Sequence, residues 1–170
     1  DHGRLTVKTA RAPLSLSLVV RPEWSNAEGL RTAVTAIVEA ALGKGDAATN
    51  AGMVACELAE NAIKYGDWSR GTGFGFHFAV ARDDASLEVV SPYDVASGSF
   101  ERLQGVLRSV RENTAKGAYL ARLAEVAEKS GEVGRLGLLR IAHELGANIT
   151  ASVENGELRV RARWSLHGPT

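Results

Sequence analysis

The pattern that most constrains the fold is the alternation of large apolar residues with small or polar ones over residues 74–80. Successive side chains of a β-strand point to opposite faces, so the three phenylalanines and the valine of this segment share one buried face. Residues 83–84 predict a turn, and residues 87–90 predict a partner strand that ends at Ser91-Pro92, because proline cannot donate to a sheet. The segment therefore predicts an antiparallel hairpin with one face against a core.

A second hairpin is predicted near the end of the sequence. Residues 149–153 and 158–164 alternate in the same way, and Asn155-Gly156 between them is a strong signal for a two-residue turn. Residues 4–20 alternate more loosely and predict one or two further strands. Together these strands favour a mostly antiparallel sheet.

Two consecutive amphipathic helices are predicted before the first hairpin. Their apolar residues recur at three- and four-residue spacings, which places them along one side of a helix. The expected limits are a cap at Ser25 or Asn26 and an end at Gly43 for the first helix, and a cap at Asp46 and an end at Tyr65, followed by Gly66, for the second.

Helical spacing returns after the first hairpin. Residues 99–133 predict about two helices, and residues 138–145 predict a short last helix closed by Gly146. This order of elements indicates an α+β fold, a two-layer α/β sandwich with a mostly antiparallel sheet and helices on one face. We expect a single domain over residues 1–170, in which residues 1–22 carry the N-terminal strands.

Composition excludes several classes of protein. The 20 Lys and Arg residues balance the 20 Asp and Glu residues to a net charge of zero, which argues against nucleic-acid binding, since that function needs clustered excess positive charge. The apolar runs fall far short of the ~20 residues of a membrane-spanning helix. Cys56 is the single cysteine and the four histidines lack ligand spacing. We therefore expect a soluble, cytoplasmic protein without a disulfide or a structural metal.

The segment from Glu57 to Gly66 carries the side chains with the clearest chemistry. On a helix, Glu57, Asn61 and Lys64 lie three or four residues apart and share one face. An amide oxygen can bind Mg²⁺, a carboxylate can take a proton, and an ammonium group can meet phosphate oxygens, so the trio fits a magnesium and phosphate site. The same residues also suit an ordinary solvated helix face, and spacing alone does not decide between the two.

A glycine-rich segment precedes the last predicted helix. It contains Gly131, Gly134 and Gly137, with Arg135 among them. Glycines allow the backbone to approach a phosphate closely, and the free amide groups at a helix N-terminus attract anions. The segment fits a phosphate-binding loop, while the alternative is a helix start punctuated by glycines.

Residues 57–66 resemble the N-box of the GHKL (Bergerat-fold) ATPase and kinase superfamily, and residues 131–139 resemble its G2 box. The sequence is most similar in these motifs to the anti-sigma-factor serine kinases and related bacterial switch kinases. The resemblance implies a histidine-kinase-like ATPase domain that binds Mg-ATP, with Asn61 holding the metal, Glu57 as general base and Lys64 near the phosphates. It also implies phosphate contacts from Gly131, Gly134, Arg135 and Gly137.

One box of the superfamily is degenerate in this sequence. Relatives place an Asp after a strand to accept the adenine amino group, whereas Ser91 or Pro92 stands at that place here and Asp94 lies further on. Ser91, through a water, or Asp94, in a rebuilt loop, are the candidates for this contact. Loss of one buried hydrogen bond costs about 1–3 kcal/mol, so weak or altered nucleotide binding is expected. Residues 99–133 replace the usual glycine-rich lid with a helical, lid-like insertion.

The motifs and the resemblance support two functions. The first is an ATP-binding regulatory domain, a serine/threonine protein kinase or anti-sigma-type switch in bacterial partner-switching signalling. By resemblance its partner is a small STAS-domain antagonist or a sigma factor, and a homodimer is also compatible. The alternative is a catalytically degenerate, protein-binding module of the same fold. Nucleic-acid binding through Arg159, Arg161 and Arg163 is less favoured than an exposed sheet face.

Overall fold

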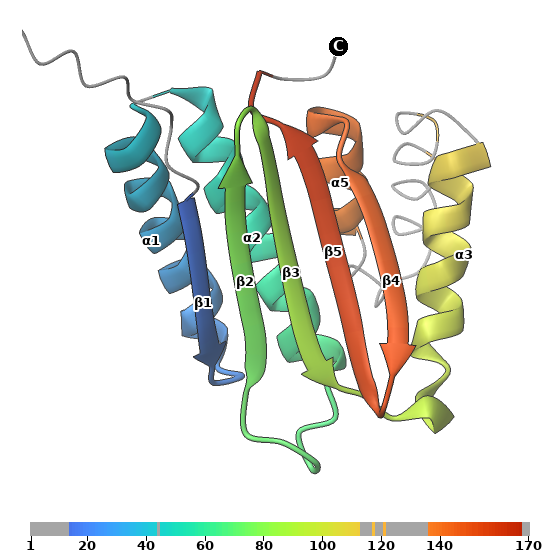
Figure 1. Cartoon of the computed structure of the whole chain (residues 1–170). Coiled ribbons are helices and arrows are strands. Elements are labelled where there is room, and N and C mark those ends of the chain that lie inside the picture. Colours follow the sequence, from blue (N-terminus) through green and yellow to red (C-terminus); the bar gives the residue numbers. More distant parts are fainter. Residues whose placement is uncertain (1–13, 44, 113–116, 118–120, 122–135, 168–170) are drawn as a thin grey trace, which may run out of the picture.

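The computed structural model describes residues 14–43, 45–112, 117, 121 and 136–167. Its strands form one five-stranded sheet in the order β1-β2-β3-β5-β4, and every neighbouring pair is antiparallel (Figure 1). The elements are, in chain order, β1 (Leu14–Val20), α1 (Trp24–Leu42), α2 (Asp46–Tyr65), β2 (Phe74–Ala81), β3 (Asp84–Pro92), the short 3-10 helix η1 (Val95–Ser97), α3 (Ser99–Glu112), α5 (Leu136–Leu145), β4 (Asn148–Glu154) and β5 (Glu157–Ser165).

The helices cover one face of the sheet, as predicted. Figure 1 shows α1, α2 and α5 behind the strands and α3 beside β4. In β2, Phe74, Phe76, Phe78 and Val80 are buried under the helices, while the residues between them are partly or fully exposed on the other face. The α+β, two-layer arrangement is therefore confirmed.

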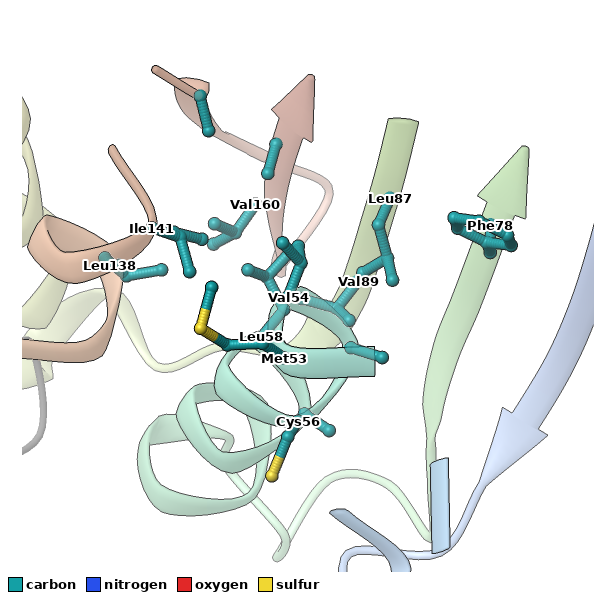
Figure 2. Packing of buried hydrophobic residues seen from close by; sticks show 14 of the residues in the cluster. Met53, Val54, Cys56, Leu58, Phe78, Leu87, Val89, Leu138, Ile141 and Val160 are labelled. Atoms are coloured by element: carbon teal, nitrogen blue, oxygen red, sulfur yellow. The ribbon is translucent and has the colours of Figure 1, made fainter. Parts of the chain in front are cut away.

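The core lies between the sheet and the buried sides of α2 and α5. Figure 2 shows Val54 and Leu58 of α2 among Val89 of β3, Val160 of β5 and Ile141 of α5. Each of these side chains is at most 5% exposed. Burial of an aliphatic side chain of this size contributes ~1.5–3 kcal/mol relative to leaving it in water. This packing fixes the rotation of α2 about its axis, and with it the direction in which the polar residues of α2 emerge.

Close packing of α1 against α2 depends on the absence of a side chain at Gly52. A Cβ at this position would overlap Thr35 Oγ1 and would lie 2.9 Å from the carbonyl oxygen of Arg31. The Thr35 hydroxyl donates to that same carbonyl at 2.8 Å, so it is held facing Gly52. Cys56 is buried one turn further along α2, where burial raises the pKa of its thiol, which suits the packing role expected of it.

The predicted caps of the first two helices are wrong. α1 begins at Trp24, and neither Ser25 nor Asn26 caps it, because the Asn26 side-chain amide donates to the carbonyl of Arg21 at 3.0 Å. Likewise Asp46 lies in the first turn of α2 and makes no capping hydrogen bond. An acidic side chain in a first turn still interacts favourably with the helix dipole, so the sequence signal and the helix start nearly coincide.

The first hairpin is confirmed with shifted limits. It turns at residues 82–83, where Arg82 adopts a left-handed φ of 58°, so the predicted turn at Asp83-Asp84 is one residue late. β3 does not stop before Ser91-Pro92 but runs through Pro92, whose partner across the sheet is Glu157. Pro92 is tolerated because it is the last residue of the strand, where no further ladder bond is needed.

The second hairpin and the last helix follow the sequence closely. Asn155 and Gly156 have φ values of 53° and 75°, the left-handed conformation that a two-residue turn of this kind requires. α5 ends just before Gly146, which has a φ of 61°. Both predictions are confirmed.

The face of the sheet away from the helices is polar, and its arginine row is exposed as predicted. Arg159 and Arg161 of β5 both pair with Glu88 of β3, at 3.6 and 2.8 Å. At the edge of the sheet, the Gln104 side chain of α3 donates to the carbonyl of Ala151 in β4 at 3.1 Å. α3 thus covers the free edge of β4, which protects it from pairing with another strand.

The structure describes the two predicted special segments in part. The region of the N-terminal strands, residues 1–22, contains β1, and the insertion over residues 99–133 contains α3, while the remainder of both falls largely outside the described residues. Within the described part of the chain, a helix with the length and hydropathy needed to cross a membrane is absent.

Candidate functional site

Asn61 presents an amide oxygen near the end of α2. Its Nδ2 donates to the carbonyl oxygen of Glu57, 2.7 Å away in the preceding turn. A carbonyl can only accept, so the nitrogen must be the atom that faces the backbone, and Oδ1 is turned away from it. Amide oxygens are suitable ligands for hard cations such as Mg²⁺. The orientation of Asn61 therefore suits a metal ligand.

The Glu57 carboxyl group is partly buried one turn before Asn61. Burial raises the pKa of this carboxyl group above its usual range, and the neighbouring charge of Glu60 raises it further, against the opposing effect of Arg140 and Arg31. A carboxylate whose pKa is raised holds a proton more readily, which is the property that a general base at neutral pH needs.

The first turn of α5 lies directly against Glu57. A Cβ at Gly137 would overlap Glu57 Oε2, and Oε1 would be 3.3 Å from it. The absence of a side chain at position 137 is therefore what lets the carboxyl group approach the helix. The first turn of a helix carries free amide groups and the positive end of the dipole, so this is a favourable place for a negative charge.

The other predicted phosphate-binding residues, Gly131, Gly134 and Arg135, fall outside the described residues. Of the glycine-rich segment, the structure thus places Gly137 next to Glu57. The phosphate contacts of this segment stay a prediction.

A small cavity joins Asn61 to the end of β3. Ser91 is buried in β3, with 3% of its surface exposed, and lines the same cavity. The cavity has a volume of about 20 Å³, enough for a single water molecule. It is lined by Asn61, Ala62, Tyr65, Val89, Ser91, Leu103, Leu138, Leu158 and Val160.

Two predicted site residues lie elsewhere. Lys64 is exposed, and its Nζ is 5.3 Å from the centre of the Tyr65 ring. Asp94 is exposed as well, and its Oδ1 accepts from the amide of Ala96 at 2.9 Å at the start of η1. Neither side chain lines the cavity, so of the two adenine candidates Ser91 is the one that reaches it.

The residues fit the two implied ligands unequally. Mg²⁺ usually binds through one or two protein groups together with waters and phosphates, so the single Asn61 oxygen is a sufficient protein contribution. The described residues contain no group of three or more His, Cys, Asp or Glu side chains that could hold a metal ion. A nucleotide base does not fit, because ligand pockets occupy ~300 Å³ or more, and this cavity holds about 20 Å³.

Comparisons with known proteins give a structural match. The chain is similar to a chain in the crystal structure of the SiaB–SiaC complex from Pseudomonas aeruginosa, with a TM-score of 0.65 over 91% of each chain. The two sequences are 18% identical, so the similarity shows the fold. No family model matches the sequence, and no curated protein does.

Sequence reasoning missed several residues that form the site. Tyr65, Leu103 and Leu138 line the cavity, yet none was a predicted site residue. Leu103 and Leu138 occupy apolar positions of their helices, a signal that indicates a core position and does not reveal proximity to a polar group. Tyr65 follows the N-box trio directly and was the one that its place in the motif could have indicated.

Proposed function

We propose that this chain is an ATP-binding regulatory domain that acts on a small protein partner, as a serine/threonine kinase or an anti-sigma-type switch. The observation that carries the proposal is the meeting of Glu57 and Asn61 on α2 with the first turn of α5. Their spacing and chemistry are those of the N-box, and Gly137 stands beside them in the tertiary structure although it lies 80 residues further along the sequence.

Each polar residue has a distinct role in this proposal. The Asn61 oxygen would hold Mg²⁺, whose chemistry is to neutralise charge on the phosphates of ATP. The Glu57 carboxylate would take the proton of the acceptor hydroxyl, because it is partly buried and its pKa is raised. Ser91 would face the base from the end of β3.

The proposed partner is a small STAS-domain antagonist or a sigma factor. Support comes from the family resemblance of the motifs and from the SiaB–SiaC structure, in which the similar fold was crystallised in a complex. The partner itself is to be identified by experiment.

Calorimetric titration with Mg-ATP tests nucleotide binding. We expect binding to the wild type and a loss of at least about tenfold in affinity for Asn61→Ala, equivalent to ~1.4 kcal/mol. Asn50→Ala is the matched control, since it makes the same chemical change near the other end of α2. Equal binding by the wild type and Asn61→Ala would contradict the metal role of Asn61.

A second function is favoured by one specific observation, the small volume of the cavity together with Ser91 in place of the adenine-binding Asp. On this alternative the chain binds its protein partner without turning over nucleotide. Transfer of labelled phosphate from ATP to a co-purified partner separates the two functions. Transfer that is lost in Glu57→Gln supports the kinase, whereas partner binding without any transfer supports the binding module.

A further inference from the structure

The cavity beside Asn61 is filled by two leucines from helices that meet over it. Leu103 comes from α3 and Leu138 from α5, and they are 4% and 1% exposed. Opposite them lie Asn61 of α2 and Ser91 of β3. The space has polar groups on one side and removable apolar side chains on the other, as a ligand pocket would have if its apolar wall moved outward.

α3 is attached to the rest of the fold by a small set of contacts. Of its 14 residues, only Ser99, Leu103 and Leu107 are buried. The Tyr93 hydroxyl accepts from the amide of Phe100 at 2.6 Å, and Gln104 donates to β4. A helix with so few buried apolar side chains belongs to the less stable part of a fold, which can open without global unfolding.

The segment before α3 has the geometry of a hinge. Tyr93 is fully buried and fixes the end of β3, whereas residues 94–97 are exposed. Gly98 then adopts a left-handed φ of 65° immediately before α3 begins. A rotation at Gly98 would move Leu103 away from the cavity while Tyr93 stays in place, because glycine adopts many backbone conformations at little cost.

We propose that α3 is an occluding helix: in the closed state described here, Leu103 occupies the space that the base of the nucleotide would take, and binding requires α3 to move outward. The inference rests on the proposed function and adds a regulatory step to the same site. Apparent affinity is then reduced by the fraction of molecules in which α3 is open. Any partner that draws α3 away from the cavity would raise nucleotide affinity in the same proportion.

Leu103→Ala and Leu107→Ala form a matched pair for testing this proposal. Both leucines belong to α3 and are almost equally buried, at 4% and 3%, but only Leu103 lines the cavity beside Asn61. Gln104→Ala is a milder third variant that removes the hydrogen bond to β4 and leaves the leucines intact.

The measurement is titration with a fluorescent ATP analogue in the presence of Mg²⁺, together with hydrogen exchange of the α3 amides. We expect Leu103→Ala to bind at least about tenfold more tightly than the wild type, Gln104→Ala to bind a few-fold more tightly, and Leu107→Ala to remain within about twofold of the wild type. In the wild type, added nucleotide should accelerate exchange in α3, where a ligand bound beneath a closed helix would slow it.

The outcomes distinguish the occlusion from the proposed function. Nucleotide binding that is the same in the wild type and Leu103→Ala, with slower exchange in α3, would overturn the occlusion and leave ATP binding intact. An equal gain in Leu103→Ala and Leu107→Ala would also overturn it, because general loosening of α3 would then explain the gain. Absence of binding in all four proteins would overturn both.

Discussion

Substitution of Gly137 by alanine tests whether the Glu57 carboxyl group lies against the first turn of α5. The new Cβ would overlap Glu57 Oε2, so the carboxyl group must move. Crowding of this kind typically costs ~1–3 kcal/mol. Alanine is favoured over glycine inside a helix by up to ~1 kcal/mol, which offsets part of that cost. We therefore expect Gly137→Ala to lower the free energy of unfolding by about 0–2 kcal/mol.

The decisive comparison is the same substitution in a Glu57→Ala background. The overlap is then absent and the helix propensity of alanine remains, so Gly137→Ala should stabilise this protein by up to ~1 kcal/mol. The change of sign corresponds to a coupling energy of ~1–3 kcal/mol between the two positions, which urea unfolding of the four proteins measures. An equal effect of Gly137→Ala in both backgrounds would show that Glu57 and Gly137 are not in contact.

Three further predictions concern stability. Glu57→Gln should raise the melting temperature at neutral pH: since the folded-state pKa of Glu57 is raised, its ionisation destabilises the fold as the pH climbs from the usual carboxyl range through the folded-state value, and the gain should vanish below that range; a gain that is independent of pH would contradict this. Gly52→Ala should destabilise the protein by ~1–2 kcal/mol in urea unfolding, and Thr35→Ala in the same chain should recover part of the loss, so simple additivity of the two changes would argue against the contact. Asn155→Ala should cost about 1 kcal/mol because φ at this position is 53°, whereas Asn155→Gly should cost less, and calorimetric melting would reveal a reversed order if the turn has another conformation.

The sequence predicted the sheet better than it predicted the helix ends. The alternation in β2 and the Asn155-Gly156 turn each report a local property, the period of a strand and the need for left-handed backbone, so the hairpins could be located to within a residue or two. The cap of α1 could not, because Ser25 and Asn26 are both good capping residues and the choice depends on a hydrogen bond from Asn26 to Arg21.

The site was predicted where it depends on one helix and missed where it depends on packing between elements. The spacing of Glu57 and Asn61 places them one turn apart on any helix, so their proximity follows from the sequence. The approach of Leu103 and Leu138 to the same cavity depends on how α3 and α5 cross the sheet, and no local pattern encodes that crossing. A buried leucine has the same sequence signature whether it fills the core or blocks a pocket.

The strand order has a consequence for how the chain folds. β3 takes β5 as its neighbour, so Glu88 and Arg161 meet although they are 73 residues apart in the sequence. Until the C-terminal hairpin has been synthesised, β3 is an unpaired edge whose inner face carries Leu87 and Val89. Non-local pairing of this kind slows folding and leaves hydrophobic strand edges open to association in the meantime. Loss of the last hairpin should therefore produce aggregation of the nascent chain, in preference to a smaller folded domain.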